Sequence, residues 1–317
     1  MKYKKSVVLL LLICAGFSQS SWAQACCSAG TPLLSSLELP STARGNLQFA
    51  LTYEYNALLD VLSGTRTLED DTRRRVTHSV LLETSYGLSS TFSVSALLTL
   101  VQQERRIVSP FDGTESQLSA RGIGDAVVLF KHSLVPLNIF SQLEVTIGGG
   151  AKIPLGSSTL TSGGILLPAD MQPGTGAWDG ILWAYGSKGF LPTLPLNIFA
   201  TTSYRFTGVN DRFGGEHEGY KFGNEFIVSV GVGYRTDMLL DFSLHFRFRH
   251  TTPDQFGGSG IPNTGGDWFY LIPGINVKSS PNLTFRASGQ LPVYRNLKGT
   301  QLTTSFTASL TIFYILG

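Results

Sequence analysis

Hydrophobic and polar residues alternate with period two along most of the chain, from Gly45 to the C-terminus. The clearest run covers residues 240–249 (LDFSLHFRFR), where almost every second residue is a large apolar one and the residues between are polar. Such alternation is typical of β-strands with one apolar and one polar face. Ten clear segments of this kind, together with two weaker ones at about 178–190 and 268–277, predict twelve strands.

The connections between these segments alternate between short and long. Short ones are expected at 87–90, 135–137, 191–195, 236–238 and 278–281. Longer ones are expected at about 56–75, 102–121, 154–176, 208–219, 251–267 and 295–300. Short turns on one side and long loops on the other are typical of an outer-membrane barrel, and an even number of strands places both termini on the periplasmic side.

The requirements of the backbone in lipid explain why such strands form a closed barrel. Every N–H and C=O group within the bilayer needs an internal partner, which only helices and closed barrels provide. A soluble β-sandwich shows a similar alternation, but the strand lengths, the turn and loop asymmetry and the aromatic segment ends favour the barrel. The aromatic residues that fit interfacial girdles are Tyr53, Tyr55, Tyr86, Tyr204, Phe206, Tyr234 and Tyr314. We therefore predict an all-β fold, a transmembrane antiparallel β-barrel of about 12 strands with short periplasmic turns and long extracellular loops.

Composition excludes several other classes of protein. The chain has 317 residues, of which 42% are hydrophobic and 15% charged, whereas soluble domains carry roughly 25% charged residues. It is too apolar and aromatic to be disordered, and its three cysteines are too few for a disulfide scaffold. The net charge of +2 gives no sign of nucleic-acid binding. The one unbroken apolar run, residues 7–15, is shorter than the ~20 residues of a transmembrane helix.

The N-terminus has the features of a secretory signal peptide. Lys2, Lys4 and Lys5 precede the apolar run, and Ala23-Gln24-Ala25 forms an A-x-A cleavage site. We expect residues 1–25 to be removed after Ala25, residues 26–44 to form an N-terminal periplasmic segment or plug, and residues 45–317 to form the barrel in the bacterial outer membrane. The signal contains the three lysines, so the mature chain is close to neutral.

Two adjacent cysteines, Cys26 and Cys27, begin the expected mature chain. Lipid modification of Cys26 is one interpretation, although Ala23 and Gln24 differ from the residues that a lipobox prefers. A vicinal disulfide and a pair of soft-metal ligands are further interpretations. A tethered segment whose thiols have no ligand role is at least as well supported.

Several short, glycine-rich stretches resemble the outer-membrane channel family of the meta-pathway of phenol degradation type, a distant relative of long-chain fatty-acid outer-membrane transporters. They are Tyr86–Ser89, Gly122–Asp125 followed by Lys131, Ala151–Gly156, Leu167-Pro168 with Gln172–Asp179, and Leu291–Tyr294 with Gly299–Leu302. The resemblance implies a channel or transporter for passive uptake of small hydrophobic or aromatic solutes. It also makes residues 26–44 a candidate plug, with a periplasmic tail as the alternative. The chain departs from the family in ending on Gly317 rather than on an aromatic residue.

The polar face of the strands contains the candidate site. Its charged and titratable residues are Glu144, Lys152, Glu225, Arg235, Asp241, His245, Arg247, Arg249 and Arg286. In a pore they would set solute selectivity; in a filled lumen they would form a structural network of salt bridges. We expect Glu225 and Asp241 to pair locally with Arg235, Arg247 and Arg249. We interpret Asp125 as a residue that marks the start of a strand rather than as part of the site.

An enzyme is the competing function. An outer-membrane lipid hydrolase needs an outward Ser–His pair, and His78, His132 and His250 have outward parity, but no matching Ser with a supporting Asn or Asp is apparent. The sequence contains no H-E-x-x-H or C-x-x-C metal motif and no phosphate-binding loop. Gly148–Gly150 predict a bend or bulge within a strand. We expect no catalytic residues, metal or cofactor, and as partners outer-membrane lipid, the barrel assembly machinery and a small-molecule solute, with no nucleic acid.

Overall fold

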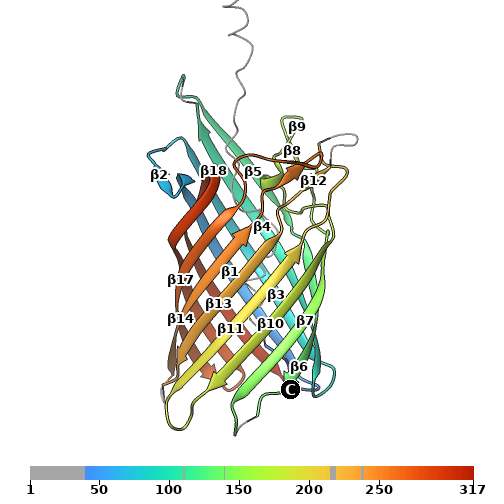
Figure 1. The fold of residues 1–317 in the computed structure, drawn as a ribbon, viewed down its shortest axis with the longest axis vertical. Helices are drawn as coiled ribbons and strands as arrows, with labels where there is room; N and C mark the ends of the chain where they lie inside the picture. The colour runs from blue at the N-terminus through green and yellow to red at the C-terminus, as the bar shows by residue number, and fades with distance from the viewer. Residues whose placement is uncertain (1–39, 110, 139, 215–218, 237–238) are drawn as a thin grey trace, which may run out of the picture.

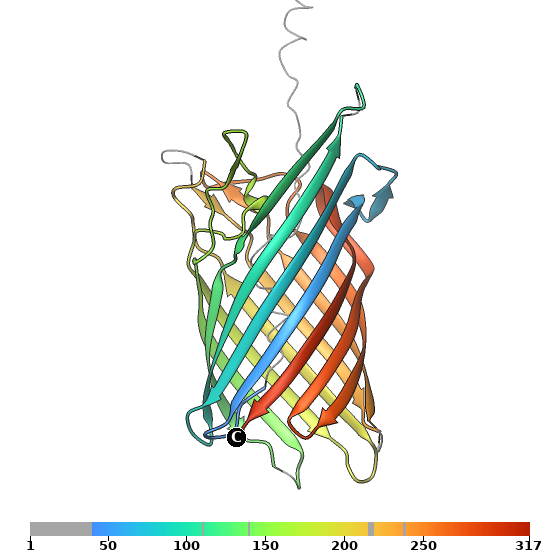
Figure 2. The same ribbon diagram turned by 180° about the vertical axis from the view of Figure 1, so that it is seen from behind.

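The computed structural model of the protein describes residues 40–317 except 110, 139, 215–218 and 237–238. The chain forms an antiparallel sheet of tilted strands that closes into a barrel (Figures 1 and 2). The strands of the ring, in order, are β1 (Leu47–Gly64), β3 (Arg73–Gly87), β4 (Phe92–Val108), β6 (Ala126–Val135), β7 (Leu143–Ile153), β10 (Asp179–Gly189), β11 (Leu196–Phe206), β13 (Glu225–Tyr234), β14 (Leu240–Thr251), β17 (Gly266–Ser280) and β18 (Leu283–Leu316). Two further strands, β2 (Arg66–Leu68) and β5 (Glu115–Ile123), extend the sheet at β1 and β4.

Strand β18 crosses the barrel twice. Its first part, as far as Leu297, pairs with β17, and its last part, from Thr300, pairs with β1. Because both pairings are antiparallel and the ring is closed, the chain reverses direction within β18. Gly299 lies at this reversal with a φ of 76°, a conformation that glycine adopts without strain. The eleven strands of the ring therefore make twelve passes, and the prediction of a closed barrel of about 12 strands is confirmed.

The two faces of the wall follow the alternation of the sequence. On β14, the side chains of Phe242, Leu244 and Phe246 are 46%, 36% and 57% exposed on the outside, whereas Arg249 is 6% exposed inside the barrel. Because β1 pairs with β18, the hydrogen-bond ladder closes on itself and the ring has no unpaired strand edge in its apolar outer surface. The predicted division of β14 into an apolar outer and a polar inner face is correct.

The connections differ from the prediction at the loop end of the barrel. The segments 56–75 and 102–121 are mostly strand, because β1 continues to Gly64, β3 begins at Arg73, and β4 and β5 form a ribbon beyond the rim (Figure 2). The remaining loops contain β8 (Thr161–Ser162), β9 (Ile165–Leu166), the 3-10 turn η2 (Ala169–Met171), β12 (Tyr220–Lys221), β15 (Gln255–Phe256) and β16 (Ser259–Gly260). The short turns lie at the other end, beside the C-terminus (Figure 1).

A row of outward aromatic rings follows the wall near its loop end. Successive ring centroids from β11 to β18 lie 4.4 to 6.4 Å apart, through Tyr204 with Phe206, then Phe226, Phe248, Phe269 and Tyr294. Aromatic rings of this kind mark the boundary between the lipid and the aqueous phase. The expected girdle residues Tyr204 and Phe206 belong to this row.

The described end of the N-terminal segment lies inside the barrel. Thr42 is buried and donates a hydrogen bond to the hydroxyl of Ser85 at 2.7 Å, and the backbone N–H of Ser41 donates to Glu144 at 3.2 Å. The predicted signal peptide, Cys26, Cys27 and most of the predicted plug lie outside the described residues. Among the described residues no helix is long and apolar enough to cross a membrane.

Candidate functional site in the barrel interior

A belt of alternating charges crosses the inner wall near the loop end, and it begins at Asp125. Lys152 on β7 is fully buried and donates to Asp125 at 2.8 Å, and its ammonium lies 3.3 Å from Asp179 at the start of β10. The Asp179 carboxylate lies 3.9 Å from Arg205 on β11. Lys152 thus has a carboxylate on each side, as a buried cation requires.

The belt continues across the next four strands of the wall. Arg205 lies 3.3 Å from Glu225 on β13, and Glu225 accepts a hydrogen bond from Arg249 on β14 at 2.7 Å. The guanidinium of Arg249 also lies over the ring of Trp268 at 5.0 Å, and the indole N–H of Trp268 donates to Thr303 at 3.0 Å. The alternation of sign along neighbouring strands explains why so many buried charges are compatible with one lumen.

The glycine-rich stretches that resemble a channel family meet at Asp125. This carboxylate accepts hydrogen bonds from the backbone N–H groups of Gly156 at 3.1 Å and Thr175 at 3.0 Å. A Cβ on Gly174 would lie 2.5 Å from the backbone of Gly156, so the two segments approach too closely for any side chain. Asp125 does lie directly before β6, as interpreted from the sequence, but it also fixes the loop 154–178 to the wall.

The same loop is held a second time, by two arginines on the inner wall. Arg75 on β3 donates to the carboxylate of Asp170 at 3.0 Å and to its carbonyl at 3.1 Å, and Arg105 on β4 also donates to this carboxylate. All three side chains are at most 9% exposed. Gln172 joins the two sides of the loop by bonds to Leu160 at 2.9 and 3.0 Å. The turn η2 is thus fixed inside the mouth of the barrel.

A second group of charges lies nearer the turn end, beside Ser41 and Thr42. Lys131 on β6 is buried 3.8 Å from Glu83 on β3, and its ammonium lies 4.7 Å from the ring centroid of Trp183. Glu144, which accepts from Ser41, lies on the next strand, β7. Asp125 and Lys131, although six residues apart on one face, belong to two different clusters.

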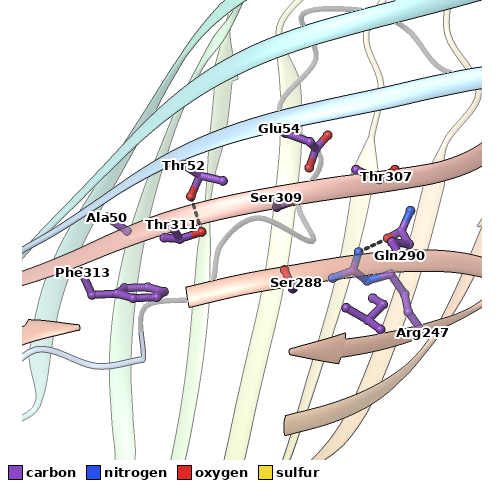
Figure 3. Close-up of a pocket in the computed structure, with 11 residues that line it drawn as sticks. Ala50, Thr52, Glu54, Arg247, Ser288, Gln290, Thr307, Ser309, Thr311 and Phe313 are labelled. Carbon is purple, nitrogen blue, oxygen red and sulfur yellow. Dashed lines mark hydrogen bonds between the residues drawn. The ribbon is translucent and has the colours of Figure 1, made fainter. Parts of the chain in front are cut away.

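The wall made by β1, β14, β17 and β18 is lined mainly by hydroxyl groups around one arginine. Figure 3 shows Arg247 with its guanidinium directed at Gln290, to which it donates at 2.5 Å, while its Nε donates to Ser229 at 3.1 Å. Thr52 and Thr311 share a hydrogen bond of 2.9 Å across β1 and β18. The pocket is lined by Ala50, Thr52, Glu54, Arg247, Ile272, Ser288, Gln290, Thr307, Ser309, Thr311 and Phe313. Its volume of about 50 Å³ is enough for a few water molecules.

A hollow of about 330 Å³ lies at the mouth of the barrel on the turn end. Asp241 there pairs with Lys278 at 2.6 Å, and Arg286 donates to Asn276 at 2.7 Å and lies over the ring of Phe313 at 4.9 Å. The residues that line the hollow are Asn197, Phe199, Gly233, Tyr234, Arg235, Asp241, Phe242, Ser243, His245, Asn276, Lys278, Thr284 and Arg286. Four of the nine predicted lumen residues therefore gather at this mouth.

The structure corrects the expected local network. Glu225 does pair with Arg249, but its other partner is Arg205, and Asp241 pairs with Lys278 rather than with an arginine. The prediction for Asp241 was wrong because Lys278 faces it from β17, a strand whose charges the sequence analysis did not consider. Arg235 follows the end of β13 and is exposed at the mouth.

The sequence analysis missed further interior charges, among them Arg75, Glu83, Arg105, Asp170, Asp179 and Arg205. Arg75 and Arg105 fell in segments expected to be loops. Their parity was a usable signal, since Arg75 and Thr77 on β3 and Gln103 and Arg105 on β4 continue the inward series. Asp170 gave no such signal because it lies in a loop.

The outward histidines are placed as predicted, with one difference. His78 bonds to Tyr53 at 2.7 Å and His132 stacks on Phe92 at 4.3 Å. His250 has a carboxylate partner, Asp267, at 2.6 Å, which the sequence analysis did not find. Its neighbour on the other side is Phe226 rather than a serine. Among the described residues no group of three or more His, Cys, Asp or Glu could hold a metal ion.

Comparison with known proteins rests on structure alone. No family model matches the chain, and no curated protein matches it in sequence. The structure is similar to that of the COG4313 outer membrane channel from Pseudomonas putida F1, with a TM-score of 0.70 and 10% identity over 88% of this chain and 98% of that chain. The chain has the fold of an outer-membrane β-barrel. Weaker similarity extends to the toluene transporter TbuX of Ralstonia pickettii, with a TM-score of 0.43 and 10% identity over 87% of this chain and 90% of that chain.

Proposed function

We propose that this barrel is an outer-membrane channel for passive uptake of small solutes, and that its solutes are aromatic molecules, with a preference for those that carry negative charge. The proposal is supported by the closed barrel with its polar interior, by the fold shared with an outer membrane channel, and by the motifs that resemble a channel family. The observation that carries the solute class is the position of Arg247 in the hydroxyl-lined part of the lumen.

Arg247 lies among mainly neutral groups of the lumen wall and donates hydrogen bonds to Ser229 and Gln290. Its side chain is half-buried and lines a pocket. A planar guanidinium attracts carboxylates and stacks on aromatic rings, so it favours an aromatic acid over an aliphatic cation.

The hydroxyl groups around Arg247 supply the rest of the path. Thr52, Ser288 and Ser309 offer donors and acceptors that replace water around a passing solute, without a fixed charge of their own. Toward the turn end the path continues to Arg286 and Phe313, a second cation beside an aromatic ring. A small aromatic acid thus passes two arginines in succession, Arg247 among hydroxyl groups and Arg286 beside the ring of Phe313.

The test is the reversal potential of the purified barrel in a planar bilayer under a salt gradient, for the parent and for Arg247→Ala. We expect a weak anion preference in the parent and its loss in the variant, together with slower swelling of liposomes in benzoate. Arg74→Ala is the matched control, because Arg74 is an exposed cation on the outer face. Equal selectivity of the parent and Arg247→Ala would overturn the aromatic-anion assignment.

A structural barrel with a filled lumen is the second candidate function. It is favoured by the belt of buried ion pairs and by the small volume of the Arg247 pocket. A parent barrel that is folded in the bilayer yet shows neither conductance nor solute flux would establish this alternative and exclude the channel.

A further inference from the structure

We infer that the outer surface of β3, β4 and β5 contains a binding site for a phosphorylated glycolipid of the lipid A type. The inference goes beyond the channel function, because the site faces lipid rather than the lumen. It rests on a hollow in the outer wall, on the cationic and polar groups that line it, and on the apolar row directly beneath them.

The hollow has a volume of about 590 Å³ and lies on the lipid-facing side of the wall. Its lining residues are Tyr53, His78, Val80, Leu100, Val101, Gln102, Arg121, Gly122 and Ile123. Strand pairing places His78, Gln102 and Arg121 side by side in one row, because His78 pairs with Gln102 and Gln102 with Arg121. Three donor-bearing side chains from three strands therefore converge on one outer surface.

The next outward row toward the turn end is mainly apolar. Tyr53 pairs with Val80, Val80 with Leu100, and Leu100 with Ile123. These four outward side chains are 37% to 57% exposed. An amphiphile with its anionic head at the upper row and its acyl chains along the lower row matches both rows at once.

The charge of Arg121 is available to a ligand. Within the described part of the chain the side chain of Arg121 forms no hydrogen bond or ion pair. The neighbouring outward arginines already have acidic partners: Arg74 pairs with Asp71 at 3.1 Å and Arg106 with Glu115 at 2.7 Å. A phosphate is the anion best suited to such a guanidinium, because it accepts two parallel hydrogen bonds from it.

His78 adds a second donor. Its Nδ1 is engaged with the hydroxyl of Tyr53 at 2.7 Å, which fixes the ring and leaves Nε2 for an external partner. When Tyr53 donates to Nδ1, Nε2 carries the proton and donates. The nearest outward acid on β4, Glu104, lies one row farther toward the loops, away from the apolar row.

The height of the site in the wall identifies the leaflet. Gln102 lies ten residues along β4 from Phe92, which is at the turn end. At about 3.4 Å per residue and a tilt of roughly 40°, this is a rise of about 26 Å, close to the ~25 Å height of the apolar band of such barrels. If the turns are periplasmic, the row of Arg121 lies at the outer boundary of the membrane, where the lipid is a phosphorylated glycolipid.

The girdle of the barrel supports the same assignment. From β11 to β18 the outer boundary is marked by a continuous row of aromatic rings, which suits contact with general lipid. On β3, β4 and β5 the place of such rings is taken by a histidine, a glutamine and an arginine around a hollow. The outer surface of β3, β4 and β5 thus differs from that of β11 to β18.

The experiment measures lipid binding by native mass spectrometry of the full barrel in detergent. The probes are bisphosphorylated lipid A, lipid A with its phosphates removed, phosphatidylglycerol and inorganic phosphate. We expect bisphosphorylated lipid A to bind in preference to the other three. The double variant Arg121→Ala with His78→Ala should weaken this binding by about tenfold or more, since hydrogen bonds to charged groups are the strong ones.

The matched control is Lys188→Ala, which removes an exposed cation at the turn end of β10, far from the hollow. It should bind lipid A as the parent does. The inference is overturned if the double variant binds lipid A like the parent, if Lys188→Ala loses as much, or if dephosphorylated lipid A or phosphatidylglycerol binds equally well. Because no readout here is conductance, these outcomes are independent of the proposed channel activity.

Discussion

Asp170 accepts a hydrogen bond from Arg75 at 3.0 Å although 95 residues separate them in the chain. The carboxylate belongs to a 3-10 turn in a long loop, and the guanidinium projects inward from β3. Arg105 on the neighbouring strand donates to the same carboxylate. One buried acid thus pairs with two buried cations and holds the turn η2 of the loop 154–178 inside the mouth of the barrel.

Replacing Asp170 should release this loop. Asp170→Asn removes the carboxylate that pairs with two buried guanidinium groups, and breaking a buried pair costs about 3–5 kcal/mol. We expect faster amide exchange in residues 160–175 and a larger single-channel conductance. Asp71→Asn, at an exposed ion pair on the same side of the barrel, is the control and should change neither. A loop that stays protected in Asp170→Asn would show that Asp125 and Gln172 suffice to hold it.

The membrane-facing register makes a second prediction. Leu244→Arg places a charge on the outer face of β14 and should lower the free energy of unfolding by about 2–4 kcal/mol if the residue lies near the bilayer midplane. Phe111→Arg is the control, because Phe111 is 97% exposed in the turn beyond β4 and its replacement should change stability by less than about 0.5 kcal/mol. Urea unfolding in lipid vesicles measures both. Equal stabilities of the two variants would contradict the register.

How far the sequence predicts this structure depends on which solvent a residue faces. Along β14 one side meets lipid and the other a polar lumen, so the alternation of apolar and polar residues is nearly complete and the faces follow directly. Beyond the lipid both faces of a strand can be polar. The sequence around Arg105 and Arg106 therefore predicts a loop. In the structure both lie in β4, where Arg105 is buried and Arg106 is exposed, so the alternation of the strand continues through them.

The pairing of interior charges could be predicted only where the strands are neighbours in the sequence. Arg249 and Glu225 lie on consecutive strands and were expected together, whereas the partner of Arg75 comes from a distant loop. Of the predicted bend or bulge at Gly148–Gly150, the bulge is wrong, because β7 pairs with β6 and β10 there without a shift of register. A side chain at Gly148 would lie 3.3 Å from the ring of Trp183, so the glycine makes room for an aromatic inside the barrel.

The loop sheet of β12 and β15 should depend on pH. Asp254 is buried there and accepts hydrogen bonds from Tyr220 at 2.6 Å and Gly223 at 2.8 Å. Burial raises the pKa of Asp254 above its ordinary value, and burial also raises the pKa of Tyr220. The folded loop therefore holds the Asp254 proton more tightly than the unfolded chain does. Its contribution to stability is full below the ordinary carboxyl pKa of ~4 and is lost as pH rises through the raised value.

Amide exchange of Gly223, corrected for the intrinsic rate, measures this effect. Protection should fall with rising pH above ~4 in the parent and should become independent of pH in Asp254→Asn. The loop around Asp112 is an internal control, since hydrogen bonds from Ser109 and Thr114 lower the pKa of Asp112 to about 2, below the range in which Asp254 should act. A parent whose Gly223 gains protection as pH rises would reverse the sign and refute the prediction.

The charge belt leads to a last prediction, about stability rather than selectivity. Arg249 is 6% exposed, donates to Glu225 at 2.7 Å and covers the ring of Trp268. Arg249→Ala leaves Glu225 buried with Arg205 as its remaining ion-pair partner, and a buried charge that loses a partner costs about 3 kcal/mol. Arg247→Ala removes a half-buried cation only two residues away, and the loss of its hydrogen bonds to Ser229 and Gln290 should cost less, about 1–2 kcal/mol.

Urea unfolding of the two variants in lipid vesicles separates these costs. The double variant Arg249→Met with Glu225→Gln provides a further check, because replacing a buried pair by groups of similar size is often nearly neutral. It should recover more than half of the stability that Arg249→Ala loses, while Asp179 continues to face Arg205 at 3.9 Å. If Arg249→Ala and Arg247→Ala unfold at the same urea concentration, the belt contributes no more to stability than a half-buried lumen side chain, and the buried charges of the wall would have to be explained by solute passage instead.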